Sequence, residues 1–563
     1  MGNRSSLIAK IRKLVLIEVK EMFGFFKHRK EKDSPTPQLI VHTEKTYEKK
    51  LPTISDERIT LSVNELLGGK YTYAQLLLEN FFYVNENLQK TIAQALLQTL
   101  SSLSAKKWYT FSDDCRGSEY YSHSHYLMIH GVSQADLTRE KYSHLSDEEY
   151  SALLCIGTFH YNGYFREDCL RKLADYNGHL RYFYIRMNDW VKEIRDASTE
   201  LLMLHLPKCP LYDIIKDTPI LEKLRFTRRR SEKDVGEILS LICGRIKNEL
   251  NTEHIRQLLE EEPYVRNTFY RFGCQNELFS KELLEFIIEH EPFGSSKERV
   301  LMHKLSRFGC SENEYGRYIR HKCPNVRYTA LLKKYEELGD AWDGLEELLT
   351  DKSSKVRTLA AFILKKYKAF DPLEFYRGLL GTENTLIAIT ELGTYGTKAD
   401  TEAVKDFIAS DNTTTARKAL HTYGKLMGAE GEYTYWEQLR SDDIRMSKEA
   451  YRIITENRII YSPESLWNEY RRHTDQAYRA RFVHLLCKQT DWERMKYLVK
   501  LYVDDSLDKT LKEKVADSLC SQNVYKRLSA KNADELVYVI NEHRDKLGKL
   551  ANELLFDIEK AKR

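Results

Sequence analysis

Proline and glycine are scarce in this chain of 563 residues, which contains 11 Pro and 25 Gly. These contents are too low for a fibrous or a disordered chain. The hydrophobic share of 42% and the charged share of 31% are typical of a soluble, helix-rich protein. Because the chain is longer than one compact core normally accommodates, we expect several domains or an elongated array.

Paired cysteines and long apolar runs are missing as well. None of the ten cysteines stands in a Cys-x-x-Cys pair, which excludes zinc-ribbon and thioredoxin motifs. Cys155 and Cys487 fall inside apolar helical patterns, where a free thiol behaves as a small core residue, so we expect a reducing, cytoplasmic setting. No stretch has the roughly 18 uncharged apolar residues that a membrane-spanning helix needs.

The net charge is only +4, but it is unevenly distributed. Residues 1–32 contain nine Lys or Arg and three Glu, so the remainder of the chain is slightly acidic. A nearly neutral body argues against a general nucleic-acid binder, which usually has a basic field over its fold.

The first 30 residues are predicted to form a basic amphipathic helix, followed by a proline-containing linker over residues 31–57. One interpretation places this helix on an anionic membrane surface. The residues that would then contact the membrane are Lys10, Lys13, Lys20, Phe23 and Phe26. The other interpretation, a helix that docks on protein, is favoured because Glu18 interrupts the apolar side.

Residues 58–150 are predicted to form an N-terminal helical cap with an irregular Tyr/His-rich insertion at 108–145. The insertion contains His123, His125, His130 and His144. Two histidines two residues apart suit a loop, and no His-Glu-x-x-His pattern is present. We therefore favour a polar loop over a metal site, and we predict neither metal ligands nor a cofactor.

From residue 151 to residue 563 the chain is predicted to be an array of helical repeats. Five apolar positions recur in steps of 30 residues: Val326, Val356, Leu386, Ala416 and Met446. The positions four residues later keep the same step, as neighbours on one helical face should. Turn-forming residues recur between the helices of each pair: Asp351, Gly381, Asp411 and Ser441. One helix pair of this size cannot bury its apolar face alone, so the pairs must stack.

The segment 188–202 illustrates one such helix. Its apolar face is predicted from Val191, Ile194, Ala197, Ser198 and Leu201, which recur at three- and four-residue spacing. Asp189 is expected to cap the start of the helix. Arg195 lies beside the apolar face, where we expect it to reach a carboxylate of a neighbouring pair.

Residues 159–173 and 180–195 resemble bacterial HEAT-repeat proteins, an armadillo-like family whose members mostly have no assigned function. The second segment ends in Asn-Asp-Trp-Val followed by Lys-Glu-Ile-Arg. The resemblance covers about 151–460. It implies an all-α, right-handed α-solenoid of HEAT-like helix pairs with a period of about 30–36 residues. It also implies a scaffolding or recognition role, and it provides no catalytic residues.

Candidate partner-binding residues are Trp190, Arg195, Arg266, Arg327 and Arg357. The arginines have a simpler interpretation, which we favour: each pairs with an acidic residue of an adjacent unit. Trp190 belongs to an aromatic-rich stretch, and such side chains are good interface anchors.

The sequence therefore predicts a non-enzymatic, cytoplasmic scaffold that binds a protein partner along the concave face of the solenoid. If the first helix contacts lipid, the protein lies at the inner face of the membrane. The alternative is a nucleic-acid-binding HEAT-like protein, either similar to DNA glycosylases or a scaffold for RNA or DNA. Its candidate contacts include Arg228, Arg229 and Arg230.

Overall fold

The computed structural model describes residues 55–115, 137–224, 232–490, 492–521 and 526–562. Over these residues the only regular secondary structure is helical, which confirms the all-α class. Within the described ranges, no helix is long and apolar enough to cross a membrane. The helix predicted for residues 1–30 and nearly all of the predicted linker lie outside these ranges. The chain divides into two compact units, one of residues 1–99 and 113–156 and one of residues 100–112 and 157–563.

The first unit and its junction with the second contain five described helices. They are α2 (Asp56–Leu67), α3 (Tyr73–Phe81), α4 (Glu86–Ser102), α5 (Lys107–Asp114) and α7 (Asp147–Gly157). Helix α5 corrects the prediction that residues 108–145 are irregular throughout. The helix forms because Ser104 accepts from Lys107 N at 3.1 Å and because Trp108 and Phe111, three residues apart, are buried on one face.

Part of the predicted Tyr/His-rich insertion lies outside the described residues, including His123, His125 and His130. His144 lies within them, next to the ring of Tyr142. Among the residues whose positions are described, no group of three or more His, Cys, Asp or Glu side chains is arranged to hold a metal ion.

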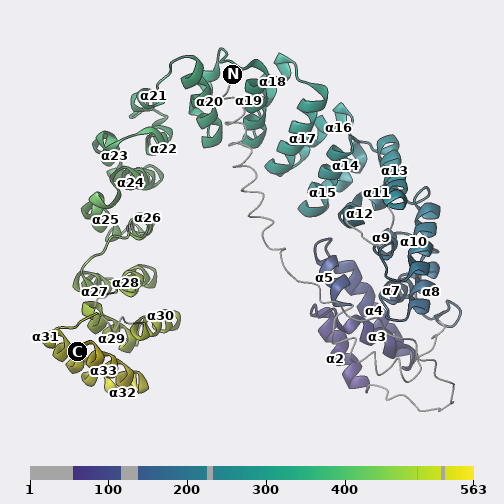
Figure 1. Ribbon diagram of the computed structural model, residues 1–563, viewed down its shortest axis with the longest axis horizontal. Helices are drawn as coiled ribbons and strands as arrows, with labels where there is room; N and C mark the ends of the chain where they lie inside the picture. Colours follow the sequence, from purple (N-terminus) through teal and green to yellow (C-terminus); the bar gives the residue numbers. More distant parts are fainter. Residues whose placement is uncertain (1–54, 116–136, 225–231, 491, 522–525, 563) are drawn as a thin grey trace. The chain divides into compact units, whose positions relative to one another are not determined.

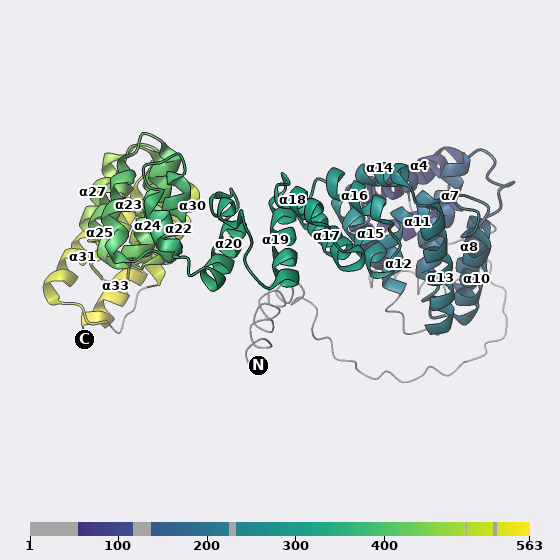
Figure 2. The ribbon, with the colours of Figure 1, turned by 90° about the horizontal axis from the view of Figure 1, so that it is seen from above.

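The second unit begins with irregular helix pairs, which give way to regular ones. Its first helices are α8 (Gly163–Leu173), α9 (Leu180–Arg186), α10 (Lys192–His205), α11 (Leu211–Lys216), α12 (Thr218–Leu224), α13 (Glu232–Glu249), α14 (Thr252–Leu259), α15 (Pro263–Gln275), α16 (Lys281–His290), α17 (Gly294–Phe308), α18 (Glu312–Ile319) and α19 (Pro324–Leu338). Helices α17 and α19 pack side by side, as Figures 1 and 2 both show.

The remainder of this unit continues the stack. Its helices are η1 (Leu345–Thr350), α20 (Ser354–Tyr367), α21 (Pro372–Gly378), α22 (Thr385–Tyr395), η2 (Lys398–Asp400), α23 (Thr401–Lys405), η3 (Asp406–Ala409), α24 (Thr413–Met427), η4 (Gly428–Gly431), α25 (Glu432–Leu439), α26 (Ile444–Glu456), α27 (Pro463–Arg472), α28 (Gln476–Lys488), η5 (Trp492–Arg494), α29 (Met495–Val503), α30 (Lys509–Cys520), α31 (Ala530–Glu542), α32 (Arg544–Leu547) and α33 (Lys549–Lys562).

Each regular pair has a first helix and a second helix. We call α20, α22, α24, α26 and α28 the second helices, and the helices that precede them the first helices. Helix α22 packs on α24, α24 on α26, and α26 on α28, so the pairs are stacked as the repeats predict. In Figure 1 the second helices from α22 to α28 follow one another along one side of the stack, and α21, α23, α25 and α27 follow one another along the other.

The 30-residue register is confirmed with one exception. Val326, Val356, Ala416 and Met446 are at most 5% exposed, whereas Leu386 is 39% exposed. In α22 the buried face consists of Ala388, Ile389 and Leu392 instead, so Leu386 and Thr390 point away from the core. The predicted turn residues do lie between the helices of their pairs, and Gly381 has a φ of 83° that favours glycine.

The fully buried apolar residues of this part of the stack form two clusters, and the partly buried Phe375 and Tyr395 pack against both. One cluster contains Leu331 to Leu364 and another begins at Tyr376 and continues to the C-terminal helices. Polar contacts also join the two clusters: Arg357 pairs with Glu391 at 2.5 Å, and the Tyr376 hydroxyl donates to Leu349 O at 3.1 Å. Both charged partners are buried, with side-chain exposures of 4% and 2%.

Candidate functional site

Five arginines occupy the fourth position of their helices and brace the loop before each helix. They are Arg166 in α8, Arg195 in α10, Arg266 in α15, Arg327 in α19 and Arg357 in α20. Each guanidinium donates to one or two backbone carbonyls five to seven residues earlier. Such bonds satisfy loop carbonyls that the helix itself cannot reach.

Four of these arginines also pair with a carboxylate of the following unit. The pairs are Arg166–Asp189, Arg266–Glu291, Arg327–Asp351 and Arg357–Glu391, at 2.9, 3.1, 2.7 and 2.5 Å. This is the structural interpretation favoured from the sequence. For Arg195 the prediction of a carboxylate partner in a neighbouring pair is wrong, because its guanidinium donates to the backbone carbonyls of Asp189 and Trp190. A direct binding function for these arginines stays a prediction.

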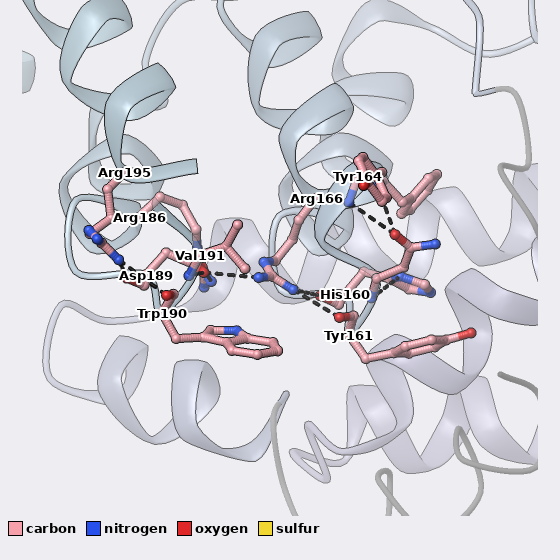
Figure 3. A network of polar contacts seen from close by, with 11 residues as sticks. His160, Tyr161, Tyr164, Arg166, Arg186, Asp189, Trp190, Val191 and Arg195 are labelled. Carbon is pink, nitrogen blue, oxygen red and sulfur yellow. Dashed lines mark hydrogen bonds and ion pairs between the residues drawn. The ribbon is translucent and has the colours of Figure 1, made fainter. Parts of the chain in front are cut away.

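Asp189 is the centre of the most buried of these networks (Figure 3). Its Oδ1 accepts from Arg166 at 2.9 Å and from Val191 N at 3.0 Å, and its Oδ2 accepts from Arg186 at 2.8 Å. Burial opposes the charge of Asp189, but Arg186 and Arg166 outweigh it and hold the pKa of the carboxyl below its ordinary value. The capping prediction is wrong here, since α10 begins at Lys192 and Val191 is its N-cap residue.

Trp190, the aromatic candidate, is accessible. Its side chain is 69% exposed, and the Arg166 guanidinium lies 5.6 Å from the centre of its ring. The same arrangement recurs at the loop before α17, where Phe293 is 46% exposed and Arg266 lies 5.3 Å from its ring. A cation over an exposed ring restrains that ring without covering it, which suits an interface anchor.

A second surface emerges from the arrangement of charge on the stack. The second helices α20, α22, α24, α26 and α28 together contain 13 Lys or Arg and three Glu. The corresponding first helices, η1, α21, η2, α23, η3, α25 and α27, contain five Lys or Arg and ten Asp or Glu. The second-helix face is the name we use for the exposed surface of the five second helices, α20, α22, α24, α26 and α28. It is basic although the chain as a whole is nearly neutral.

The second-helix face contains a hollow of about 490 Å³. Helices α22, α24 and α26 line it with Leu386, Thr390, Thr414, Arg417, Lys418, His421, Glu449 and Arg452. Leu386 and Thr390 are the two residues at which α22 departs from the repeat register. The side of α22 that points away from the core therefore contributes to the lining of the hollow.

Only one carboxylate lines the hollow, and Arg452 and His421 already hold it. Glu449 lies 3.1 Å from His421 Nδ1 and also pairs with Arg452. Burial opposes its charge, but these two neighbours hold the pKa of Glu449 below its ordinary value. Burial and the nearby Lys425 lower the pKa of Lys418, so its environment disfavours the positive charge.

Sequence reasoning missed Arg417, Lys418, His421 and Arg452. The signal in the sequence that marks them is that basic second helices alternate with acidic first helices. Three of the second helices, α20, α24 and α28, contain no acidic residue at all. The membrane-surface candidates between Lys10 and Phe26 lie outside the described residues, as do Arg228, Arg229 and Arg230.

Comparisons with known proteins do not show a family for this chain. No family model matches it, and no curated protein matches it. Among solved structures it is similar to Kap121p bound to Pho4p, with 11% identity, a TM-score of 0.30, and coverage of 90% of this chain and 64% of the other. It is also similar to importin beta, with 11% identity, a TM-score of 0.27, and coverage of 89% and 64%. The chain thus spans about two thirds of the length of either structure, and these values carry no conclusion about its function.

Proposed function

We propose that this protein is a non-enzymatic scaffold that binds an acidic segment of a protein partner along the second-helix face. The observation that supports the proposal is the segregation of charge, with the excess of cations on the second helices and the excess of carboxylates on the first helices. A surface with charge of one sign attracts and orients a partner of the opposite sign.

The repeated structure extends this attraction over several units. Arg417, Lys448 and Lys488 come from three successive second helices and are all exposed. An extended acidic segment laid across these helices meets one or more cations in each unit. Each exposed ion pair is weak, at about 0–1 kcal/mol, so the affinity depends on several pairs acting together.

Nucleic acid is the second candidate partner, because phosphates are attracted to the same face. The two partners differ in how binding responds to salt and to the chemistry of the probe. Binding of a nucleic acid that contacts several phosphates falls steeply with salt concentration.

Fluorescence anisotropy tests the proposal with two labelled probes of equal length, a 20-residue peptide of alternating Glu and Ser and a 20-nucleotide single-stranded DNA. We expect saturable binding of the peptide. The triple variant Arg417→Glu, Lys448→Glu, Lys488→Glu is expected to weaken this binding at least about tenfold, because three attractive contacts become repulsive.

The matched control reverses three cations on first helices: Lys405→Glu, Arg471→Glu and Arg472→Glu. This control should change the peptide affinity less than about twofold. Equal losses in the two triple variants, or no peptide binding even at low salt, would reject the proposal. Tighter binding of the DNA than of the peptide at every salt concentration would instead assign the face to nucleic acid.

For residues 1–30 a docking helix is the favoured interpretation, and we propose a test of the alternative, recruitment to an anionic membrane surface. The support is the sequence alone, an amphipathic pattern with six more positive than negative charges in residues 1–32. Membrane recruitment predicts that the full chain co-sediments with phosphatidylserine-containing vesicles and that the variant with Lys10, Lys13 and Lys20 changed to Glu does not. If both chains stay in the supernatant, the segment is a docking helix and membrane recruitment is refuted.

A further inference from the structure

Arg417 stands apart from the other arginines of the second helices. The other five each bind a protein group: Arg357 binds Glu391, Arg445 binds Asp443, Arg452 binds Glu449, Arg479 binds Ser506 and Arg481 binds Ser447. Arg417 forms no hydrogen bond and no ion pair with any residue that the structure describes. Arg417 lines the hollow between α22, α24 and α26.

Lys418, the next residue, is in the same situation although it is half-buried. Across the described part of the chain it has no carboxylate in contact. The only carboxylate in the hollow, Glu449, is already held by His421 and Arg452. Within the described residues, the hollow therefore contains two basic side chains that form no ion pair with the protein, and one of them is partly removed from water.

The number of uncompensated charges indicates the kind of anion that fits. A single carboxylate carries one negative charge, whereas a phosphoserine or phosphothreonine carries about −1.5 to −2 at pH 7 and has three acceptor oxygens. Guanidinium and ammonium groups form short, charge-assisted hydrogen bonds to such oxygens. Thr414, at the start of α24, belongs to the same lining, and its side chain carries a neutral hydroxyl donor.

On these grounds, and resting on the proposed function above, we propose that the hollow is the site for one phosphorylated serine or threonine within the acidic segment of the partner. Arg417 and Lys418 bind the phosphate, and the surrounding cations of the second-helix face bind the flanking carboxylates. The volume of about 490 Å³ accommodates a phosphorylated side chain together with part of its backbone.

The protein's own N-terminal segment is a poor occupant of this site. Residues 1–32 contain nine Lys or Arg against three Glu, so the segment has the same sign of charge as the hollow. Like charges brought together oppose binding. The complementary occupant is a partner with negative charge.

The test compares three labelled nine-residue peptides on the full-length protein by fluorescence anisotropy at 150 mM salt. All have Glu and Asp at the eight flanking positions; the central residue is Ser, phosphoserine or Glu. We expect the phosphoserine peptide to bind at least about tenfold more tightly than the Ser and Glu peptides. In the double variant Arg417→Ala, Lys418→Ala this preference is expected to fall below about twofold, while the Ser peptide still binds.

Lys448→Ala is the matched control, because Lys448 is an exposed cation of the same face that does not line the hollow. It should leave the preference for phosphoserine unchanged. Should the double variant fail to fold by circular dichroism, Thr414→Glu replaces it, since it puts a repelling carboxylate at an exposed position of the lining.

The outcomes separate this inference from the proposed function. If the three peptides bind equally, or if the preference survives in the double variant, the phosphate site is refuted and the acidic-partner scaffold stands. If none of the three binds, both are refuted. A preference lost only in the hollow variants supports both.

Discussion

The Asp189 network offers the sharpest test of how the arginines hold the stack together. The substitution Asp189→Asn keeps the size of the side chain and removes its charge. Two buried guanidiniums, with side-chain exposures of 3% for Arg166 and 1% for Arg186, would then lose the carboxylate that pairs with both. Asn retains one acceptor oxygen. In the place of Oδ1 it can still accept from Arg166 and Val191 N, but the bond from Arg186 is lost and the positive charges are left uncompensated.

The expected cost follows from the burial of all three groups. Removing one partner of a buried ion pair costs about 3–5 kcal/mol, because the remaining charge is left in a poorly solvating environment. The cost should appear locally, in α8, α9 and α10, since each helix pair of a solenoid contacts only its neighbours. A loss of 3 kcal/mol corresponds to roughly a hundredfold change in the opening equilibrium.

Hydrogen–deuterium exchange of peptides from α8 to α10 measures this opening free energy directly. The matched control is Asp168→Asn in the same helix as Arg166, since Asp168 pairs with Lys172 at 2.7 Å but is 46% exposed. The control should change protection by less than about 0.5 kcal/mol. Adding Arg186→Met to Asp189→Asn should recover part of the loss, because one uncompensated charge is removed. If Asp189→Asn costs no more than the control, the networks are not what secures these loops.

Three further predictions concern other parts of the second unit. Glu391→Gln should lower the opening free energy of α20 and α22 by about 3–5 kcal/mol, measured by the same exchange experiment, because Arg357 would lose its buried partner between the two apolar clusters; protection like that of the unmodified chain would contradict this. Gly424→Ala should destabilise α24 by about 1–3 kcal/mol in thermal unfolding, because the new Cβ would lie 2.9 Å from Ile453 Cγ2. Its counterpart, Gly316→Ala in α18, meets no atom within 4 Å and should stabilise by about 0.5–1 kcal/mol, and the same sign for both would refute the packing argument. Burial and the charge of Arg166 lower the pKa of His160 in the folded protein to about 3. In the unfolded chain His160 binds a proton more tightly, at its ordinary pKa of 6.5. The free energy of unfolding should therefore fall as the pH drops from 6.5 toward 3. His160→Asn should flatten this acid dependence by up to about 1.4 kcal/mol per pH unit in chemical unfolding, and an unchanged slope would show that other groups dominate it.

The fold class was predictable from the sequence because it depends on local periodicity. Val326, Val356, Ala416 and Met446 are buried as the 30-residue step requires, and Asp351 and Gly381 occupy the turns. Equivalent positions of successive repeats are equally buried as long as the helices have the same rotation about their axes. The pairing of the helix-start arginines with acidic residues of adjacent units was also favoured from the sequence, since a recurring arginine needs a recurring counter-charge.

What the sequence alone determined, therefore, is the all-helical, stacked character of the chain and the buried positions of its regular repeats. The tertiary structure decided the identity of each partner and the location of the candidate site. Asp189 binds two arginines rather than capping its helix, because the loop folds its carboxylate inward between Arg166 and Arg186. Arg417 and Lys418 share a hollow with Glu449 and Arg452, more than 30 residues away, because α24 and α26 pack together and α22 is out of register. Such contacts depend on how helices are rotated about their axes, and that rotation is set by packing between neighbouring units.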